Sequence, residues 1–353
     1  MDKKAIHSAI ESIEMDKNVL ADKITDLHFK KNPSLEKKYG HIGRERCRED
    51  AIFHLEYLIQ AMQIESRELF HHYLEWAWQM LDARNIPKVD LIHNLRYIGI
   101  VLSGHLQAEE YNTAAPYLED GEAFLEKITT DIESYIKPEK PLFEEASRYL
   151  ELLLSGKRDH AKGLIDSLVK NGVPIKDIYE HIFQTTQYEV GILWQQNKIT
   201  VAHEHYCTAA TQLIMSGLYP IIFSGSKKGL RLVACSVARE LHEIGIRMVS
   251  DFFEMDGWDT YYMGSNMPDA HLLTAIREYE AQLLAISVTL PIHIQKVEHL
   301  ISKIRSAPEF NNLKIMAGGY PFNVVPGLSS KIGADASALT ANEAVQMANK
   351  MME

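Results

Sequence analysis

Cysteine is scarce in this 353-residue sequence, and long apolar runs are absent from it. The three cysteines, Cys47, Cys207 and Cys235, stand singly, so the sequence predicts neither a disulfide framework nor a cysteine-based zinc site. No stretch approaches the ~20 apolar residues that a membrane-spanning helix needs. Basic runs are missing too, and a formal net charge of −11 argues against a nucleic-acid surface. We therefore expect a cytoplasmic protein that contacts neither membrane nor nucleic acid.

The length allows two or three domains, and the hydrophobic patterning divides the chain into three. Residues 1–135 show only helical periodicity, which predicts an all-helical domain. Residues 142–224 are again helical, with breaks near Gly172 and Asn197 that predict a four-helix bundle. A linker, 137–141, separates these two segments, because its two prolines disfavour helix. In the first domain the expected helices are 4–29, 42–62, 65–84, 89–107 and one that follows Pro116.

Residues 229–353 alternate between short apolar runs and amphipathic segments, which is the pattern of strands separated by helices. Since the loops between them are short, the expected fold is a doubly wound, Rossmann-like parallel sheet. The expected strands are 230–237, 258–263, 283–289, 313–317 and 334–339.

The loop after the first expected strand carries Glu240, His242 and Gly245. Loops at the carboxyl ends of parallel strands are where open α/β sheets bind ligands. A histidine there can point into the crevice, and Glu240 could hold its other ring nitrogen and raise the basicity of the metal-facing one. Gly245 removes a side chain where a ligand would have to come close to the backbone.

Two further features follow later strands of the same sheet. Ser287 and Thr289 end the third expected strand, and Gly318 and Gly319 follow the fourth. Taken in order, the three elements resemble the cobalamin-binding signature, D/E-x-H-x-x-G followed by S-x-L/T and then by G-G. The resemblance implies that His242 binds cobalt from below. The alternative interpretation is a flavodoxin-like domain with an ordinary loop histidine.

The bundle contains a second pattern, in which Trp194 is followed ten and eleven residues later by Glu204 and His205. Ahead of the cobalamin signature, this spacing resembles the cobalamin domains of the light-dependent carotenoid-gene repressors. The resemblance covers about residues 142–353, and it implies adenosylcobalamin enclosed by these three residues and Val201. On the structural alternative, Trp194 is a core residue and Glu204 a first-turn acid favoured by the helix dipole.

The repressors differ from this sequence at one position. They have a histidine directly after the tryptophan, which binds cobalt after photolysis, whereas Gln195 stands there in this sequence. Another residue, such as His203 or His205, would have to supply that ligand.

In the N-terminal domain, Arg46, Asp50 and His54 fall on one face of a helix. Read alone, this is a solvated face with an Arg–Asp pair worth a few tenths of a kcal/mol, beside a half-buried core histidine. However, the next helix is unusually aromatic, with Tyr73 and Trp76 among its residues. Positive and acidic groups beside an aromatic wall would suit a flat, conjugated ligand that bears propionates.

The helix with Arg46, Cys47, Asp50 and His54 also resembles the N-terminal domain of photocobilins. In that family a helical domain binds the bilin biliverdin beside a cobalamin module. The resemblance implies a biliverdin site formed by these four residues. We expect Cys47 to be a small buried residue rather than the site of a thioether bond.

The sequence thus predicts a non-enzymatic photoreceptor that binds adenosylcobalamin and biliverdin. With no effector domain visible, its output would be a light-dependent change of self-association or a contact with an unidentified partner. A second hypothesis is the corrinoid protein of a methyltransferase system, which needs an open upper face and a partner enzyme. Trp194 and Glu204 favour a closed adenosyl pocket instead. A third hypothesis is a light-independent cobalamin sensor.

Overall fold

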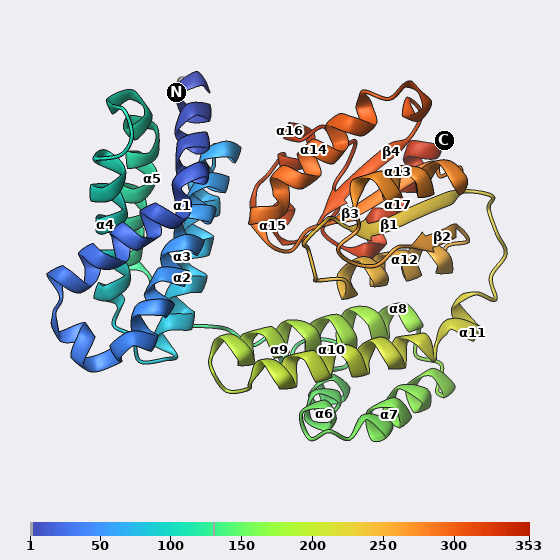
Figure 1. The fold of residues 1–353 in the computed structure, drawn as a ribbon. Coiled ribbons are helices and arrows are strands. Elements are labelled where there is room, and N and C mark those ends of the chain that lie inside the picture. The colour runs from blue at the N-terminus through green and yellow to red at the C-terminus, as the bar shows by residue number, and fades with distance from the viewer. Residues whose placement is uncertain (1–2, 130) are drawn as a thin grey trace. The chain divides into compact units, whose positions relative to one another are not determined.

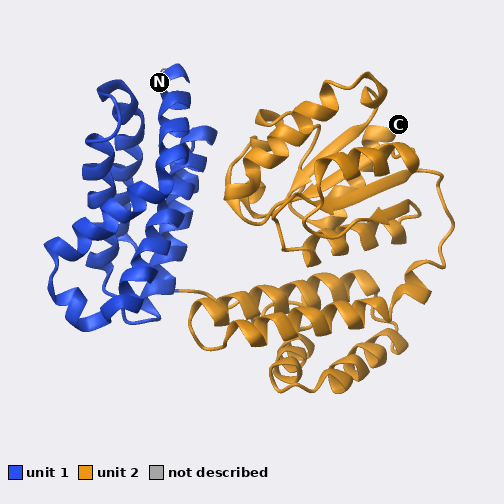
Figure 2. Cartoon of the chain, viewed as in Figure 1, with its two compact units in different colours: residues 1–131 blue, residues 132–353 orange. Residues whose placement is uncertain are grey.

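The computed structural model describes residues 3–129 and 131–353, which divide into two compact units. Figure 2 shows them as residues 1–131 and 132–353. The segments expected as a bundle and as a sheet domain lie together in the second unit, because buried residues of both contribute to one core. No helix of the described residues is long and apolar enough to cross a membrane.

The first unit is all-helical, and the apolar faces of its helices pack into a single core around residues such as Leu20, Leu55 and Leu95. One expectation fails here, because the last helix runs through Pro116 instead of following it. It starts early because Gln107 and Glu110 form a capping box at its N-terminus. The helices are α1 (Lys3–Lys31), α2 (Ser34–Ile64), α3 (Arg67–Asp82), α4 (Lys88–Ser103) and α5 (Ala108–Lys127).

The second unit begins with the helical bundle (Figure 1). Three of its elements, one of them a π-helical turn, follow one another without a break and act as one long helix. The chain turns at Gly172 and at Asn197, both with positive φ, which matches the breaks expected from the sequence. The elements are α6 (Phe143–Leu154), α7 (Arg158–Lys170), α8 (Ile175–Asp177), η1 (Ile178–Gln184), α9 (Thr185–Gln195), α10 (Val201–Ser216) and α11 (Tyr219–Ile222).

The sheet of the second unit is parallel and Rossmann-like, as the sequence predicted. Its strands are β1 (Arg231–Ser236), β2 (Asp259–Tyr262), β3 (Leu283–Ser287) and β4 (Lys314–Gly318), in the order β2-β1-β3-β4. The register pairs Ser236 with Ser287 and Ser287 with Gly318, so three strands end together at one edge. The remaining elements are α12 (Ile244–Met255), α13 (Asp269–Glu278), η2 (Pro291–His293), α14 (Ile294–Arg305), η3 (Pro308–Phe310), α15 (Tyr320–Val324), α16 (Leu328–Lys331) and α17 (Ala341–Met352).

The fifth strand expected at 334–339 is not formed. This segment makes one isolated bridge, between Met316 and Ala336. The carboxylate of Asp335 accepts the backbone N–H of Ile315 at 2.7 Å, and the chain then leaves the sheet. An apolar run predicted a strand here, but too few backbone groups pair for a ladder to form.

Candidate functional site

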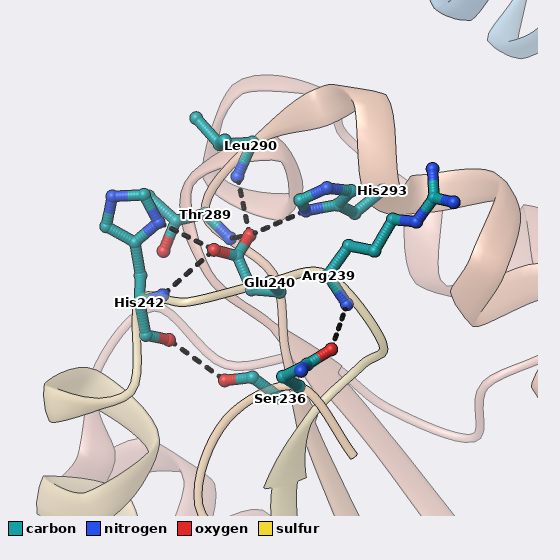
Figure 3. Close-up of polar contacts among 8 residues, drawn as sticks. Ser236, Arg239, Glu240, His242, Thr289, Leu290 and His293 are labelled. Atoms are coloured by element: carbon teal, nitrogen blue, oxygen red, sulfur yellow. Dashed lines mark hydrogen bonds and ion pairs between the residues drawn. The ribbon is translucent and has the colours of Figure 1, made fainter. Parts of the chain in front are cut away.

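The loop between β1 and α12 carries Glu240 and His242 (Figure 3). The Nδ1 atom of His242 lies 2.6 Å from Oε1 of Glu240, and the backbone N–H of His242 donates to the same oxygen at 3.0 Å. The side chain of Glu240 is fully buried, whereas that of His242 is 54 % exposed. The imidazole is therefore anchored through one nitrogen while much of its ring remains accessible.

The other carboxylate oxygen of Glu240 is held by the chain that follows β3. Oε2 accepts the backbone N–H groups of Thr289 at 2.9 Å and Leu290 at 3.0 Å. The Nδ1 atom of His293 lies 3.2 Å from it, as Figure 3 shows. Five N–H donors thus surround one buried carboxylate. Two of them are side-chain donors, Nδ1 of His242 and Nδ1 of His293, and the other three are backbone N–H groups.

These contacts set the protonation of the site. Burial by itself would raise the pKa of Glu240, but the hydrogen bonds from His242, His293 and the backbone hold it far below its ordinary value. An ionised carboxylate only accepts, so Nδ1 of His242 carries a proton and Nε2 of the neutral ring presents a lone pair. The same hydrogen bond raises the pKa of His242, against the opposing effect of burial. A more basic imidazole is a stronger metal ligand.

Two other contacts hold the loop in place. The hydroxyl of Ser236 donates to the carbonyl oxygen of His242 at 2.9 Å. Arg239 has φ of +70°, and its backbone N–H donates to Oδ1 of Asn266 at 2.7 Å. Neither Ser236 nor His293 was predicted from the sequence as a site residue. A polar residue at the end of β1 was the signal for Ser236, whereas the position of His293 gave none.

Residues of the other two motif elements lie at the same edge of the sheet. Ser287 and Gly318 are register partners, and Thr289 contributes its backbone N–H to Glu240. Gly319 has φ of +107°, and a Cβ there would overlap the carbonyl oxygen of Val288. Only glycine allows β4 to end so close to β3.

Gly245 lies in the first turn of α12, and a Cβ at this position would meet no atom within 4 Å. The packing of the described residues does not require glycine at this point. The open space next to it would admit an additional molecule.

The upper-face residues predicted from the sequence gather at one end of the bundle. Trp194 lies in the last turn of α9 and Glu204 in the first turn of α10. Oε2 of Glu204 lies 2.5 Å from Nδ1 of His205, and the side chain of Val201 is exposed. The negative charge of Glu204 also contributes to the raised pKa of His242, which places the two groups within electrostatic range.

The two histidines considered as replacement ligands both have their Nδ1 atom in a hydrogen bond. The Nδ1 atom of His203 lies 2.8 Å from the hydroxyl of Thr200, within the capping box of α10. Gln195 is buried. His205 is engaged by Glu204, although its side chain is 75 % exposed.

The residues at this edge fit a cobalt held in a macrocycle. Within residues 3–129 and 131–353, no group of three or more His, Cys, Asp or Glu side chains could hold a metal ion. A lone imidazole such as that of His242 is enough where a macrocycle supplies the other ligands. The buried Glu240, which orients the ring and increases its basicity, is the outer partner that metal-bound histidines generally have.

The first unit contains a separate cavity of about 220 Å³ between α1, α2, the end of α3 and α4. All four residues that the sequence predicted for a bilin site line it, namely Arg46, Cys47, Asp50 and His54. The predicted wall is different, however. Tyr73 is not a lining residue, although its hydroxyl lies 2.7 Å from Nδ1 of His54, which is. Phe29 and Tyr39 are aromatic residues that line the cavity. Trp76 does not line it.

Three polar groups that line the cavity have shifted pKa values. Burial lowers the pKa of His54 to about 4 and raises that of Asp50 to about 6 and of Cys47 to about 12. Two further lining groups, His28 Nε2 and Asn94 Oδ1, are buried without a hydrogen-bond partner within the described residues. No sequence pattern indicated these two residues, since they lie on α1 and α4, away from the helix of Arg46.

Two segments of the second unit match family models. Residues 230–348 match the model described as B12 binding domain, and residues 145–219 match a second model of the same description. They contain the site edge and the bundle. The matches support a cobalamin or related corrinoid as the cofactor of this unit.

Named relatives cover the same part of the chain. A dimethylamine corrinoid protein of Methanosarcina barkeri is 25 % identical over 205 residues, which is 57 % of this chain and 94 % of the relative. A corrinoid protein of Desulfitobacterium hafniense is 23 % identical over 207 residues, 57 % of this chain and 94 % of that one. The solved monomethylamine corrinoid protein of Methanosarcina barkeri has a TM-score of 0.53 at 22 % identity, over 60 % of this chain and 100 % of its own. That similarity shows the fold alone.

The photoreceptor prediction is wrong. The relatives are named as corrinoid proteins of methylamine systems, which agrees with the second hypothesis and not with a light sensor. Light-dependent self-association, which depended on that prediction, is withdrawn with it. The prediction failed because it rested on the positions of Trp194 and Glu204 at the ends of adjoining bundle helices. These positions do not identify the group that the two side chains would contact.

Proposed function

We propose that this chain is a corrinoid protein of a methyltransferase system, which carries a methyl group between partner enzymes rather than catalysing a reaction alone. The observation that carries the proposal is the pair of Glu240 and His242, anchored at the carboxyl edge of a sheet that matches the B12 binding domain. The names of the relatives support methyl transfer as the context.

When bound, the corrinoid supplies a cobalt that accepts a methyl group from a donor and returns it to an acceptor. The protein's own residues hold and orient it. His242 would bind cobalt through Nε2, since Nδ1 donates to Glu240. The residues proposed to contact the corrinoid on the sheet side are Gly245, Ser287, Thr289, Gly318 and Gly319. Glu240, whose side chain has no exposed surface, is proposed to act on it through His242.

On the bundle side, the proposed upper-face residues are Trp194, Val201, Glu204 and His205. The effect of the Glu204 charge on His242 supports a location near that imidazole. Val201 and His205 are exposed, which supports access to the upper face by a methyl donor. The adenosyl group predicted from the sequence is the competing occupant of this face.

Reconstitution with two cofactors separates these occupants. The apoprotein is loaded in parallel with methylcobalamin and adenosylcobalamin in the dark, and cofactor retained through gel filtration is measured. A sample loaded with hydroxocobalamin is then reduced with titanium(III) citrate and offered methyl iodide. We expect retention of methylcobalamin and formation of bound methylcobalamin. Retention of adenosylcobalamin alone, with no methylation of the bound cofactor, would overturn the methyl-carrier proposal.

We propose, secondly, that the cavity of the first unit binds biliverdin. The specific support is that Arg46, Cys47, Asp50 and His54 all line it. The Arg46 side chain is 74 % exposed, so it could pair with a propionate at the mouth. Small-molecule pockets are typically at least ~300 Å³, so a bilin would extend out of the enclosed volume.

Titration of biliverdin into the full-length protein tests this second proposal. Arg46→Ala should weaken binding, because charge-assisted hydrogen bonds contribute roughly 1.5–3 kcal/mol. The matched control is Arg48→Ala, on the same helix, since Arg48 pairs with Asp22 and does not line the cavity. Absence of saturable binding, or equal loss in the two variants, would rule out this site. Cobalamin loading should be the same in both.

A further inference from the structure

We propose that His293 is a second positioning residue for the cobalt ligand, acting on His242 through Glu240. The inference rests on the proposed function, because it requires His242 to bind a corrinoid cobalt. Its basis is the continuous contact from one imidazole through a buried carboxylate to another, drawn in Figure 3.

The two oxygens of Glu240 accept from different donors. Oε1 receives both of its donors from His242. Oε2 receives the backbone N–H groups of Thr289 and Leu290 and the ring of His293. Because the carboxylate is ionised and can only accept, Nδ1 of His293 carries the proton in this contact.

His293 is held rigidly. It ends the short helical turn η2 directly before α14, and its side chain is only 6 % exposed. Glu240 has no exposed surface, so water does not substitute for a missing donor without rearrangement. His293 therefore fixes the carboxylate from the side opposite to His242.

The His293 donor also affects the charge that Glu240 presents to His242. Each of the five donors stabilises the ionised form of Glu240 and so lowers its affinity for protons. The carboxylate therefore attracts each remaining donor less strongly. When the His293 donor is removed, the carboxylate of Glu240 attracts the Nδ1 proton of His242 more strongly. The imidazole then becomes more basic at Nε2 and binds cobalt more strongly. In cobalt corrinoids an axial base stabilises the Co(II) state over Co(I), which does not bind one, so the midpoint potential should fall.

The test is a potentiometric titration of the hydroxocobalamin-loaded full-length protein and of two variants. His293→Leu removes the donor, and His293→Gln keeps an N–H donor of similar reach. We expect His293→Leu to lower the Co(II)/Co(I) midpoint, and His293→Gln to restore much of it. A tenfold change in the equilibrium between the two states corresponds to about 59 mV for this one-electron couple.

His299→Leu is the matched control, because it makes the same substitution on α14 at an exposed histidine. It should leave the midpoint at the wild-type value. If His293→Leu loads cobalamin and keeps the wild-type midpoint, His293 has no positioning role. If His293→Leu fails to load cobalamin, His293→Gln is compared with wild type instead. Wild-type loading and an unchanged midpoint in His293→Gln support the role of the donor. Failure of His293→Gln to load contradicts that role.

Electron paramagnetic resonance of the Co(II) state separates this inference from the proposed function. The wild type should show splitting from one axial nitrogen, which His242→Ala should lose. If the wild type lacks the splitting, the ligand assignment of His242 fails and the inference fails with it. If the wild type shows it but His293→Leu changes neither splitting nor midpoint, only the inference fails.

Discussion

The hydroxyl of Tyr179 lies 2.8 Å from Oδ2 of Asp251, and both side chains are buried where the bundle packs on α12. Tyr179 belongs to the π-helical turn η1, which also carries Phe183 into the same core. Burial raises the pKa of Asp251 to about 6, although hydrogen bonds from the two tyrosines Tyr179 and Tyr219 and the charge of Arg247 oppose the increase. A titrating carboxyl therefore lies at the contact between the bundle and the cobalamin-binding sheet.

This carboxyl should make stability depend on pH. Since its pKa is higher in the folded state than in the unfolded chain, the folded protein binds more protons between about pH 4 and 6. The free energy of unfolding should fall as the pH rises through that window. One pKa unit corresponds to ~1.4 kcal/mol, so the total is on the order of 3 kcal/mol. Chemical denaturation of wild type and Asp251→Asn at several pH values measures this pH dependence. If the free energies of unfolding of the two proteins change with pH in parallel, the prediction is wrong.

Replacement of His242, the proposed cobalt ligand, should abolish tight cofactor binding. His242→Ala removes the Nε2 donor, and even partners of a metal-bound histidine typically contribute 10–100-fold to affinity. We expect a loss of at least about that size, measured by cobalamin retention through gel filtration. His299→Ala serves as the control. Wild-type retention by His242→Ala, with an unchanged absorption spectrum, would show that another residue binds the cobalt.

Glu240→Gln should destabilise the apoprotein and weaken cobalamin binding. A glutamine amide would place an N–H₂ group among five N–H donors, in a position with no exposed surface. Because the pKa of Glu240 is lowered by folding, its contribution is present above pH ~4.5 and is lost as the pH falls. Denaturation at pH 7 and pH 4 should therefore show a smaller difference between variant and wild type at the lower pH. A constant difference would argue against an ionised Glu240.

Two glycines of the site should respond differently to alanine. Gly319→Ala places a Cβ on the carbonyl oxygen of Val288 at a positive φ, which should cost about 1–3 kcal/mol or more of unfolding free energy. Gly245→Ala meets open space in a helix, so the apoprotein should be as stable as wild type or more stable. Cobalamin loading should nevertheless fall in Gly245→Ala, if the corrinoid comes close to this backbone. Unimpaired loading would remove Gly245 from the site.

Cys47 should resist alkylation. Burial raises the pKa of its thiol to about 12, from an ordinary value of 9.0, and only the thiolate is nucleophilic. At pH 8 its reaction with iodoacetamide should be on the order of a thousandfold slower than that of a free cysteine. Mass spectrometry of labelled peptides measures the rate, and the protein unfolded in urea gives the reference. Rapid labelling in the folded state would also reopen the question of a thioether bond to a bilin.

Local patterning determined much of this structure. Helical periodicity predicted the helices of both units, because a face that repeats every three to four residues can be buried only as a helix. Glycine, proline and asparagine marked the turns at Gly172 and Asn197. The loop with Glu240 and His242 was predicted at the end of β1 because strand, loop and helix follow one another within 25 residues.

Tertiary structure decided the features that depend on residues far apart in the sequence. His293 reaches Glu240 across 53 positions, and no spacing rule connects them. In the first unit, His28 of α1 and Asn94 of α4 likewise line the same cavity as Arg46. Trp76, which was expected to form one wall of this site, does not line it. The strand expected at 334–339 had the right composition but found only one partner in the sheet.

The sequence by itself therefore determined the helices, the parallel sheet and the edge at which a cofactor would bind. It did not determine the function, because Trp194 and Glu204 indicate a covered site without specifying the covering group. The packing decided which side chains share the charge of Glu240 and which polar groups of the first unit are left without partners. Such contacts form only when distant segments are held together by a common core, so they depend on the folded chain as a whole.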